Sequence, residues 1–153
     1  MLIPENLSQR RKNRIFAVQF LYSWAVNSID EIANLSDAIA TFSEKFFQSD
    51  ATNYDFGKEL AEGAVSNLDV IDELIKKHAT HWTLERIATV DLAILRIAIY
   101  EMLFRNDVPP IVAINEAIDI GKAMSSEESG KFLNGVLEGV KKELNRPLRH
   151  AGF

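Results

Sequence analysis

Four cationic side chains lie within five residues near the start of the chain: Arg10, Arg11, Lys12 and Arg14. Lysine and arginine bind the phosphates of nucleic acids, and guanidinium planes also stack on unpaired bases. The cluster runs directly into an apolar segment, residues 15–24, that suits a helix. A merely solvated helix end would have the same composition, so charge alone leaves RNA binding and solvation as equal alternatives.

A helix with 3.6 residues per turn divides this apolar segment into two faces. One face carries Arg11, Ile15, Val18 and Tyr22, and the other carries Phe16, Phe20 and Trp24. We expect the second face to be core. The first face places a guanidinium in line with an aromatic ring, which predicts a surface for single-stranded RNA.

The body of the chain is acidic, although both ends are basic. The formal net charge is −5, but residues 15–140 carry 9 Lys/Arg against 20 Asp/Glu, whereas residues 1–14 and 141–153 are each net +3. An acidic body repels polyanions at long range. Any nucleic acid should therefore be held at a local patch, with a strong dependence on salt.

The sequence contains no set of residues that predicts catalysis or a metal site. It has no cysteine, which excludes disulfides, thiolate metal sites and a cysteine nucleophile. His78 and His81 could share a helix face, but zinc needs three or four ligands. Glu101 lies in an apolar segment, and its spacing from Arg105 suits an ion pair. We expect no enzyme activity, cofactor or metal.

Apolar residues recur at helical spacing almost throughout, which predicts an all-α fold. Helices are predicted over residues 8–25, within 29–47, and over 54–78, 83–105, 111–124 and 125–145. The fourth of these is apolar nearly all round and should be the buried central helix, with a break near Ala88. We expect one domain, residues 1–153, with helical halves at about 8–78 and 83–145.

Capping patterns set several helix ends. Pro110 suits the first turn of a helix. Ser125 and Glu128 have the spacing of a capping box, so Ser125 is the expected N-cap of the last helix. Pro147 should end that helix, and residues 146–153 are expected to be frayed. The most apolar stretch, residues 90–104, is too short for the ~20 residues of a membrane span. We therefore expect a soluble, intracellular protein without membrane contact.

Five sequence blocks together resemble a known family. They are RRKNRIFAVQFLYSW at 10–24, ILRIAIYE at 94–101, DVP at 107–109, AINEA at 113–117 and KFLNGVL at 131–137. In this order they are similar to the NusB family of transcription antitermination factors. The resemblance implies about seven helices in two roughly perpendicular three-helix bundles, and no catalysis or cofactor.

The resemblance also implies partners. Members of the family bind boxA RNA together with the ribosomal protein NusE, and join other Nus factors on RNA polymerase to suppress termination in ribosomal RNA operons. A member can also bury its arginine cluster in a homodimer. By matching positions, the implied RNA-binding residues are Arg10, Arg11, Lys12, Arg14, Glu128, Lys131 and Phe132. The implied partner-facing residues are Tyr22, Glu85 and Asp91. Phe132 could stack on a base or pack in the core.

Two other functions are alternatives to transcription antitermination for a helical chain of this kind. The same helical module occurs as the N-terminal domain of ribosomal RNA cytosine methyltransferases, and the length of this chain argues against that enzyme. A purely protein-binding helical adaptor would leave the basic cluster solvated and unused.

Overall fold

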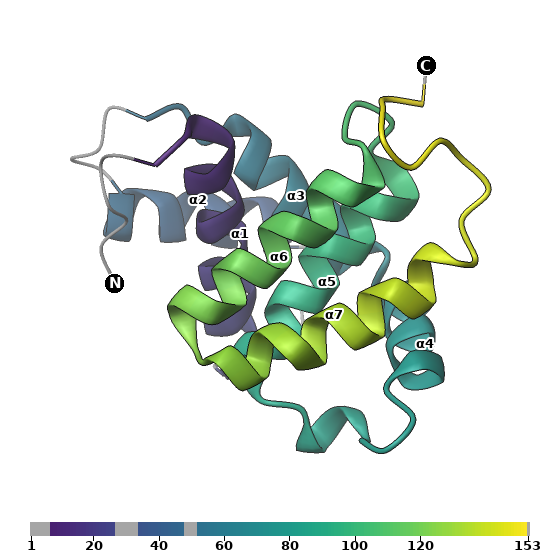
Figure 1. Ribbon diagram of the computed structural model, residues 1–153. Helices are drawn as coiled ribbons and strands as arrows, with labels where there is room; N and C mark the ends of the chain where they lie inside the picture. Colours follow the sequence, from purple (N-terminus) through teal and green to yellow (C-terminus); the bar gives the residue numbers. More distant parts are fainter. Residues whose placement is uncertain (1–6, 27–33, 48–51, 153) are drawn as a thin grey trace.

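The computed structural model describes residues 7–26, 34–47 and 52–152. Within these ranges the chain forms seven α-helices and a short 3₁₀ helix, without a strand (Figure 1). The elements are α1 (Gln9–Val26), α2 (Leu35–Phe47), α3 (Asp55–Ser66), α4 (Leu68–His78), η2 (Leu84–Arg86), α5 (Thr89–Phe104), α6 (Pro110–Met124) and α7 (Glu127–Lys141). The prediction of an all-α fold is confirmed. None of the described helices is long and apolar enough to cross a membrane.

Helix α5 lies at the centre, as its sequence predicts. Its buried side chains come from every face of the helix, because α1, α3 and α4 pack against it together with α6 and α7. Figure 1 shows α6 and α7 side by side, with α1 running steeply across their direction. The helices therefore form two groups at a large angle, and α5 contacts both.

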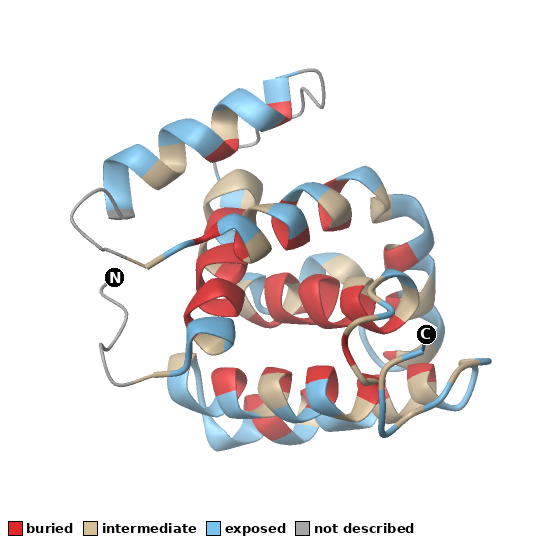
Figure 2. Cartoon of the chain, turned by 90° about the horizontal axis from the view of Figure 1, so that it is seen from above, coloured by how far each residue is buried: buried red, intermediate tan, exposed pale blue. Residues whose placement is uncertain are grey.

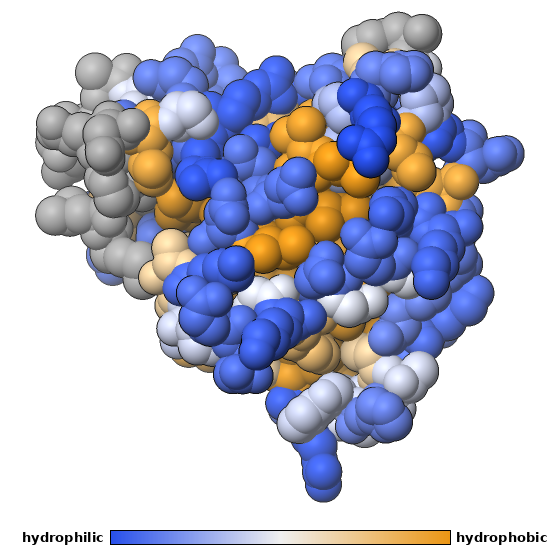
Figure 3. Space-filling model, in the orientation of Figure 1, coloured by the Kyte–Doolittle hydropathy of each residue, from blue (hydrophilic) through white to orange (hydrophobic). Residues whose placement is uncertain are grey.

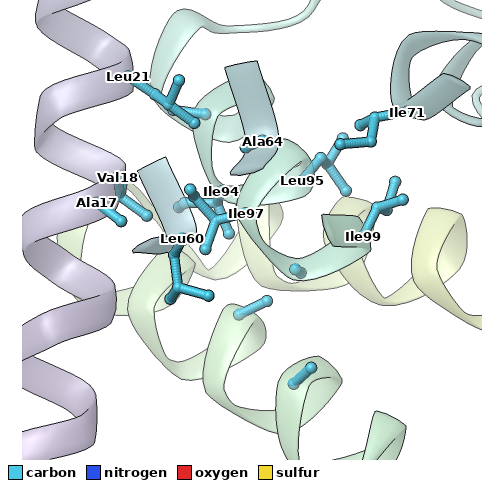
Figure 4. Close-up of a cluster of buried hydrophobic side chains, with 14 of the residues drawn as sticks. Ala17, Val18, Leu21, Leu60, Ala64, Ile71, Ile94, Leu95, Ile97 and Ile99 are labelled. Atoms are coloured by element: carbon cyan, nitrogen blue, oxygen red, sulfur yellow. The ribbon is translucent and has the colours of Figure 1, made fainter. Parts of the chain in front are cut away.

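The buried side chains of the two groups form one hydrophobic cluster. Figure 4 shows part of it, in which residues of α1, α3, α4 and α5 meet: Ala17, Val18, Leu21, Leu60, Ala64, Ile71, Ile94, Leu95, Ile97 and Ile99. Helix α2 lies at the edge with most of its residues exposed (Figure 2). Because the two groups of helices share one core, the predicted division of the domain into two halves at residues 78–83 stays a prediction.

The predicted helix over residues 54–78 is two helices, α3 and α4, which meet at Asn67. The Asn67 side chain donates a hydrogen bond of 2.8 Å to the carbonyl oxygen of Gly63. Asparagine competes in this way with the backbone pattern of a helix, which explains the break. The predicted break before α5 is confirmed, because η2 ends at Arg86 and α5 begins at Thr89.

The N-cap of α7 is Ser126, so the prediction of Ser125 is wrong by one residue. The Ser126 hydroxyl oxygen accepts a hydrogen bond of 3.1 Å from the backbone N–H of Ser129. Ser125 instead ends α6, with its N–H bonded to the Gly121 carbonyl oxygen. Two consecutive serines offered the same cap, and the turn after α6 selects the second.

The described part of the C-terminal tail, residues 146–152, is held against the fold, which corrects the expectation of a frayed end. The Arg146 guanidinium donates to the carbonyl oxygens of Met102, Arg105 and Val108, at 3.0, 3.1 and 2.7 Å. These contacts satisfy carbonyl groups at and beyond the end of α5, where a helix lacks its own partners. Arg146 therefore ties the tail to the end of α5, and backbone hydrogen bonds from Ile111 to Leu148 and from Gly152 to Asn106 hold the rest of it.

Candidate RNA and partner interface

The structure separates the four cations of the N-terminal cluster. Arg10 is exposed, with its guanidinium 3.8 Å from the centre of the Phe56 ring and 3.6 Å from the Asp107 carboxylate. Arg11 is partly exposed and bonds two carboxylates of α6, Glu116 at 2.6 Å and Asp119 at 2.9 Å. These hydrogen bonds and charges raise the pKa of Arg11. The two arginines therefore differ in how freely they can meet a phosphate.

Lys12 and Arg14 belong to the interior. They are 9% and 4% exposed, so the cluster does not form one solvent-facing patch of four. The Arg14 guanidinium makes a bidentate hydrogen bond to Glu101, at 2.8–3.1 Å, and Glu101 is 1% exposed. Burial raises the pKa of Glu101, and the hydrogen bonds from Arg14 act in the opposite direction. The geometry gives Arg14 a structural role.

The ion pairs around Glu101 differ from the local pairing that the sequence suggested. Arg105 does not pair with Glu101 but with Glu59 at 2.8 Å and with both oxygens of Asp107 at 2.9 Å. Partial burial would raise the pKa of Asp107, but the hydrogen bonds and charge of Arg105 outweigh it and lower that pKa. Arg14 of α1 thus replaces Arg105 as the partner of Glu101, while Arg105 pairs with Glu59 of α3 and with Asp107 in the loop after α5.

The expected division of α1 into an RNA face and a core face is also wrong. Ile15 and Val18, placed on the RNA face, are 9% and 1% exposed. Helix α1 lies between α3 and α5, which cover it from more than one side. Only Arg11 and Tyr22 of that face reach solvent, so the exposed part of α1 is its first turn and its C-terminal end.

Asn13, inside the basic cluster, fixes the start of α1 to α3. Its amide nitrogen donates to the carbonyl oxygens of Gln9 and Asn53, and its amide oxygen accepts from the N–H of Gly57. A Cβ atom at Gly57 would lie 2.6 Å from the Asn13 carbonyl oxygen, so the two helices approach closely only because residue 57 is glycine. No pattern in the sequence predicts this contact between Asn13 and Gly57.

The second predicted RNA segment lies at the start of α7. Glu128 and Lys131 are highly exposed and form an ion pair of 3.7 Å. Phe132 is partly buried and packs against the core, while it also lines a surface hollow of about 570 Å³. The hollow is lined by Trp82, Arg86, Ile87, Ala88, Asp91, Ser126, Glu128, Ser129, Lys131 and Phe132. Residues predicted for RNA and for the protein partner therefore meet at one place.

Asp91 is the buried polar group of this hollow, 7% exposed. One carboxylate oxygen accepts a hydrogen bond of 3.1 Å from the Ser129 hydroxyl, and the other has no partner among the described residues. Burial raises the pKa of Asp91, and the Ser129 hydrogen bond acts against this. An unpaired buried acceptor favours a hydrogen-bond donor supplied from outside.

The other two predicted partner residues lie near the same end of α5. Tyr22 is 45% exposed and lines a hollow of about 500 Å³ with Gln19, Ser23, Phe42, Phe46, Val90 and Met124. Val90 of that hollow is the neighbour of Asp91, so the two hollows flank the first turn of α5. Glu85 is exposed in η2, and hydrogen bonds to its own backbone N–H and to Thr83 lower its pKa.

The structure does not join the two predicted RNA segments into one cluster. Arg11 meets α6 at Glu116, whereas α7 begins after the end of α6 at Met124. Eight helical residues separate these points, or about 12 Å. Lys122 lies between them, exposed and 3.9 Å from Glu127, and it is not among the predicted RNA-binding residues. Figure 3 shows the face over α6 and α7 as mainly hydrophilic around an apolar strip.

Comparison with known proteins places this geometry in a family. The model of the NusB family matches residues 11–142. The chain belongs to the NusB family. It is 40% identical over 140 residues to the transcription antitermination protein NusB of Thermodesulfovibrio yellowstonii, which covers 88% of this chain and 93% of that protein. It is 43% identical to the NusB of Desulfosudis oleivorans, over 90% of this chain and 88% of that protein.

Solved NusB structures share the fold. The NusB of T. maritima is 33% identical, with a TM-score of 0.74 and 94% of each chain covered. A NusB solved in complex with NusE and double-stranded RNA is 26% identical, with a TM-score of 0.75, over 89% of this chain and 98% of that one. A NusB-family chain that matches its relatives over nearly their whole length shares their activity, transcription antitermination.

Proposed function

We propose that this chain binds boxA-type single-stranded RNA together with the ribosomal protein NusE. The observation that carries the proposal is the exposed, largely uncommitted guanidinium of Arg10 at the start of α1, on a body that is otherwise acidic. A related NusB has been solved with NusE and double-stranded RNA, which supports NusE and RNA as the two kinds of partner. No step of this activity requires a catalytic group.

The RNA surface of the proposal runs from Arg10 and Arg11, along α6, to Lys131 and Phe132. Arg10 can meet a phosphate directly, whereas Arg11 must share or exchange its carboxylate partners on α6. Glu128 lies beside Lys131 and weakens RNA binding by repulsion. Lys12 and Arg14 contribute by holding the start of α1 in place, since both are buried.

The protein-partner surface of the proposal surrounds the first turn of α5. Asp91 offers an unpaired acceptor, Tyr22 an exposed ring, and Glu85 an exposed negative charge. An acidic surface of this kind suits a basic ribosomal protein. The hollow that joins Asp91 to Lys131 and Phe132 supports a position for the bound partner next to the RNA surface.

The wider setting follows from the family and belongs to the same proposal. The complex would act in the cytoplasm with other Nus factors on RNA polymerase, in ribosomal RNA operons. A homodimer that covers the basic cluster is a second state of the chain, and RNA would compete with it.

A gel-shift assay at two salt concentrations tests the proposal. The chain mixed with its cognate NusE should shift a boxA-like RNA at a much lower concentration than a scrambled RNA of the same composition. Arg10→Ala should weaken the shift and reduce the salt slope by ~0.7, the value for one phosphate contact on a single strand. Equal shifts of the two RNAs would reject specific recognition. No shift of either RNA, with NusE still bound, would favour the protein-binding adaptor.

A further inference from the structure

The ring of Phe56, at the start of α3, is surrounded by guanidinium groups. Arg10 lies 3.8 Å from the ring centre, Arg105 5.1 Å and Arg14 5.5 Å. All three are within the ~6 Å range of a cation–π contact. Only the Arg10 distance is that of a plane resting directly on the ring. The Phe56 ring therefore packs against one face of the Arg10 guanidinium.

The three arginines differ in what else they bind. Arg14 is bound to Glu101, and Arg105 to Glu59 and Asp107, at hydrogen-bond distances. The Arg10 side chain is 53% exposed, and its one ion pair among the described residues is the 3.6 Å contact with Asp107. Its guanidinium thus has donors and an outer face available for a ligand, while Phe56 and Asp107 restrict its motion.

The surroundings of Arg10 suit a nucleotide. A shallow hollow of about 440 Å³ lies beside it, lined by Gln9, Arg10, Asn13, Asn53, Asp55 and Phe56. The first turn of α1 carries no acidic side chain, so the positive end of that helix dipole adds to the charge of Arg10, and Asp55 is the one acid among the residues that line the hollow. A flat cation for stacking and a positive helix end for a phosphate lie together.

We infer that Arg10 and Phe56 form a stacking platform for one unpaired base of a single-stranded RNA. The base lies on the outer face of the Arg10 guanidinium, and the inner face rests on Phe56. The inference rests on the proposed function and adds a base contact at a place where charge alone would give only phosphate contacts. Guanidinium planes and aromatic rings are the usual partners of unstacked bases in RNA recognition.

Substitutions of Phe56 test the platform. Phe56→Leu removes the ring and keeps an apolar side chain, so RNA binding should weaken roughly 5- to 20-fold, in the lower part of the range for base–aromatic stacking. The salt slope should not change, because no phosphate contact is lost. Phe56→Tyr keeps the ring and should bind like the parent protein. Phe104→Leu is the matched control, since Phe104 is 45% exposed at the end of α5 and lines neither the hollow beside Arg10 nor the two hollows that flank the start of α5, and it should leave RNA affinity unchanged.

Arg10→Lys separates the plane from the charge. Lysine keeps the positive charge but has no flat face, so affinity should fall several-fold while the salt slope stays within ~0.7 of the parent value. Unchanged affinity in both Arg10→Lys and Phe56→Leu would overturn the platform. Thermal unfolding of each variant confirms that the fold is intact.

An abasic scan identifies the base. Each nucleotide of the RNA is replaced in turn by an abasic one, which keeps the phosphate. One abasic position should weaken binding to the parent chain and have no effect on Phe56→Leu. If Phe56→Leu loses affinity equally for every abasic RNA, the ring has no specific base and the inference is wrong. The scan works on any single strand that binds, so a failure of boxA preference in the parent chain would reject the proposed function and leave the platform testable.

Discussion

The buried ion pair between Arg14 and Glu101 shows how one residue of a basic cluster can serve the fold. The pair joins the first helix to the central helix, with side chains 4% and 1% exposed. Removing one partner of a buried pair typically costs about 3–5 kcal/mol, because the other charge stays buried alone. We therefore expect Arg14→Ala to lower the free energy of unfolding by that amount in urea titrations.

A double variant controls for this effect. Arg14→Met with Glu101→Leu removes both charges and keeps the volume, so it should be far more stable than Arg14→Ala. A double variant as unstable as the single one would contradict the buried-charge explanation. If Arg14→Ala loses RNA binding under conditions where it is still folded, Arg14 would be an RNA contact after all.

Asp107 should make stability depend on pH in the acid range. Partial burial opposes ionisation, but the hydrogen bonds and charge of Arg105 outweigh it, and the folded-state pKa is lowered. The stabilisation is thus complete above the unfolded value of ~3.9 and is lost as pH falls through the lower folded value. Unfolding in urea should show Asp107→Asn less stable than the parent at pH 6, with the difference shrinking below pH 4. A difference of constant size at acid pH would count against this linkage.

At the scale of the helix, the start of α7 depends on one serine. Ser126 caps the helix through the Ser129 N–H, and Ser125 does not. Loss of an N-cap costs ~1 kcal/mol. Ser126→Ala should therefore lower the free energy of unfolding by about this amount, and the matched Ser125→Ala should cost clearly less. The reverse order would place the cap at Ser125, as the capping-box pattern predicts.

The positions of most helices could be predicted from apolar spacing, proline and capping residues, because these signals are local. The break before α5 and the role of Pro110 at the start of α6 are confirmed. The burial of α1 could not be predicted. Lysine and arginine are usually exposed, so Lys12 and Arg14 were expected at the surface. Glu101, which pairs with the buried Arg14, lies 87 positions away in the sequence. Long separation in sequence also hid the contact of Arg11 with α6, 105 positions away, and the stack of Arg10 on Phe56.

At the scale of the whole molecule, the acidic body should speed association with a basic partner. The formal net charge of −5 attracts a basic ribosomal protein over about one Debye length, ~8 Å at physiological salt. We expect the association rate with NusE to fall several-fold as salt rises.

Glu85→Lys, beside the proposed partner surface, should lower the association rate by a further factor of roughly 2–5 and leave the dissociation rate nearly unchanged. Glu62→Lys is the matched control, because Glu62 is an exposed acid on α3 whose charge acts on Tyr100, towards the other end of α5. Stopped-flow mixing at two salt concentrations measures both rates. If both variants slow association equally, the attraction comes from net charge alone, and the acidic face around α5 has no special part in choosing the partner.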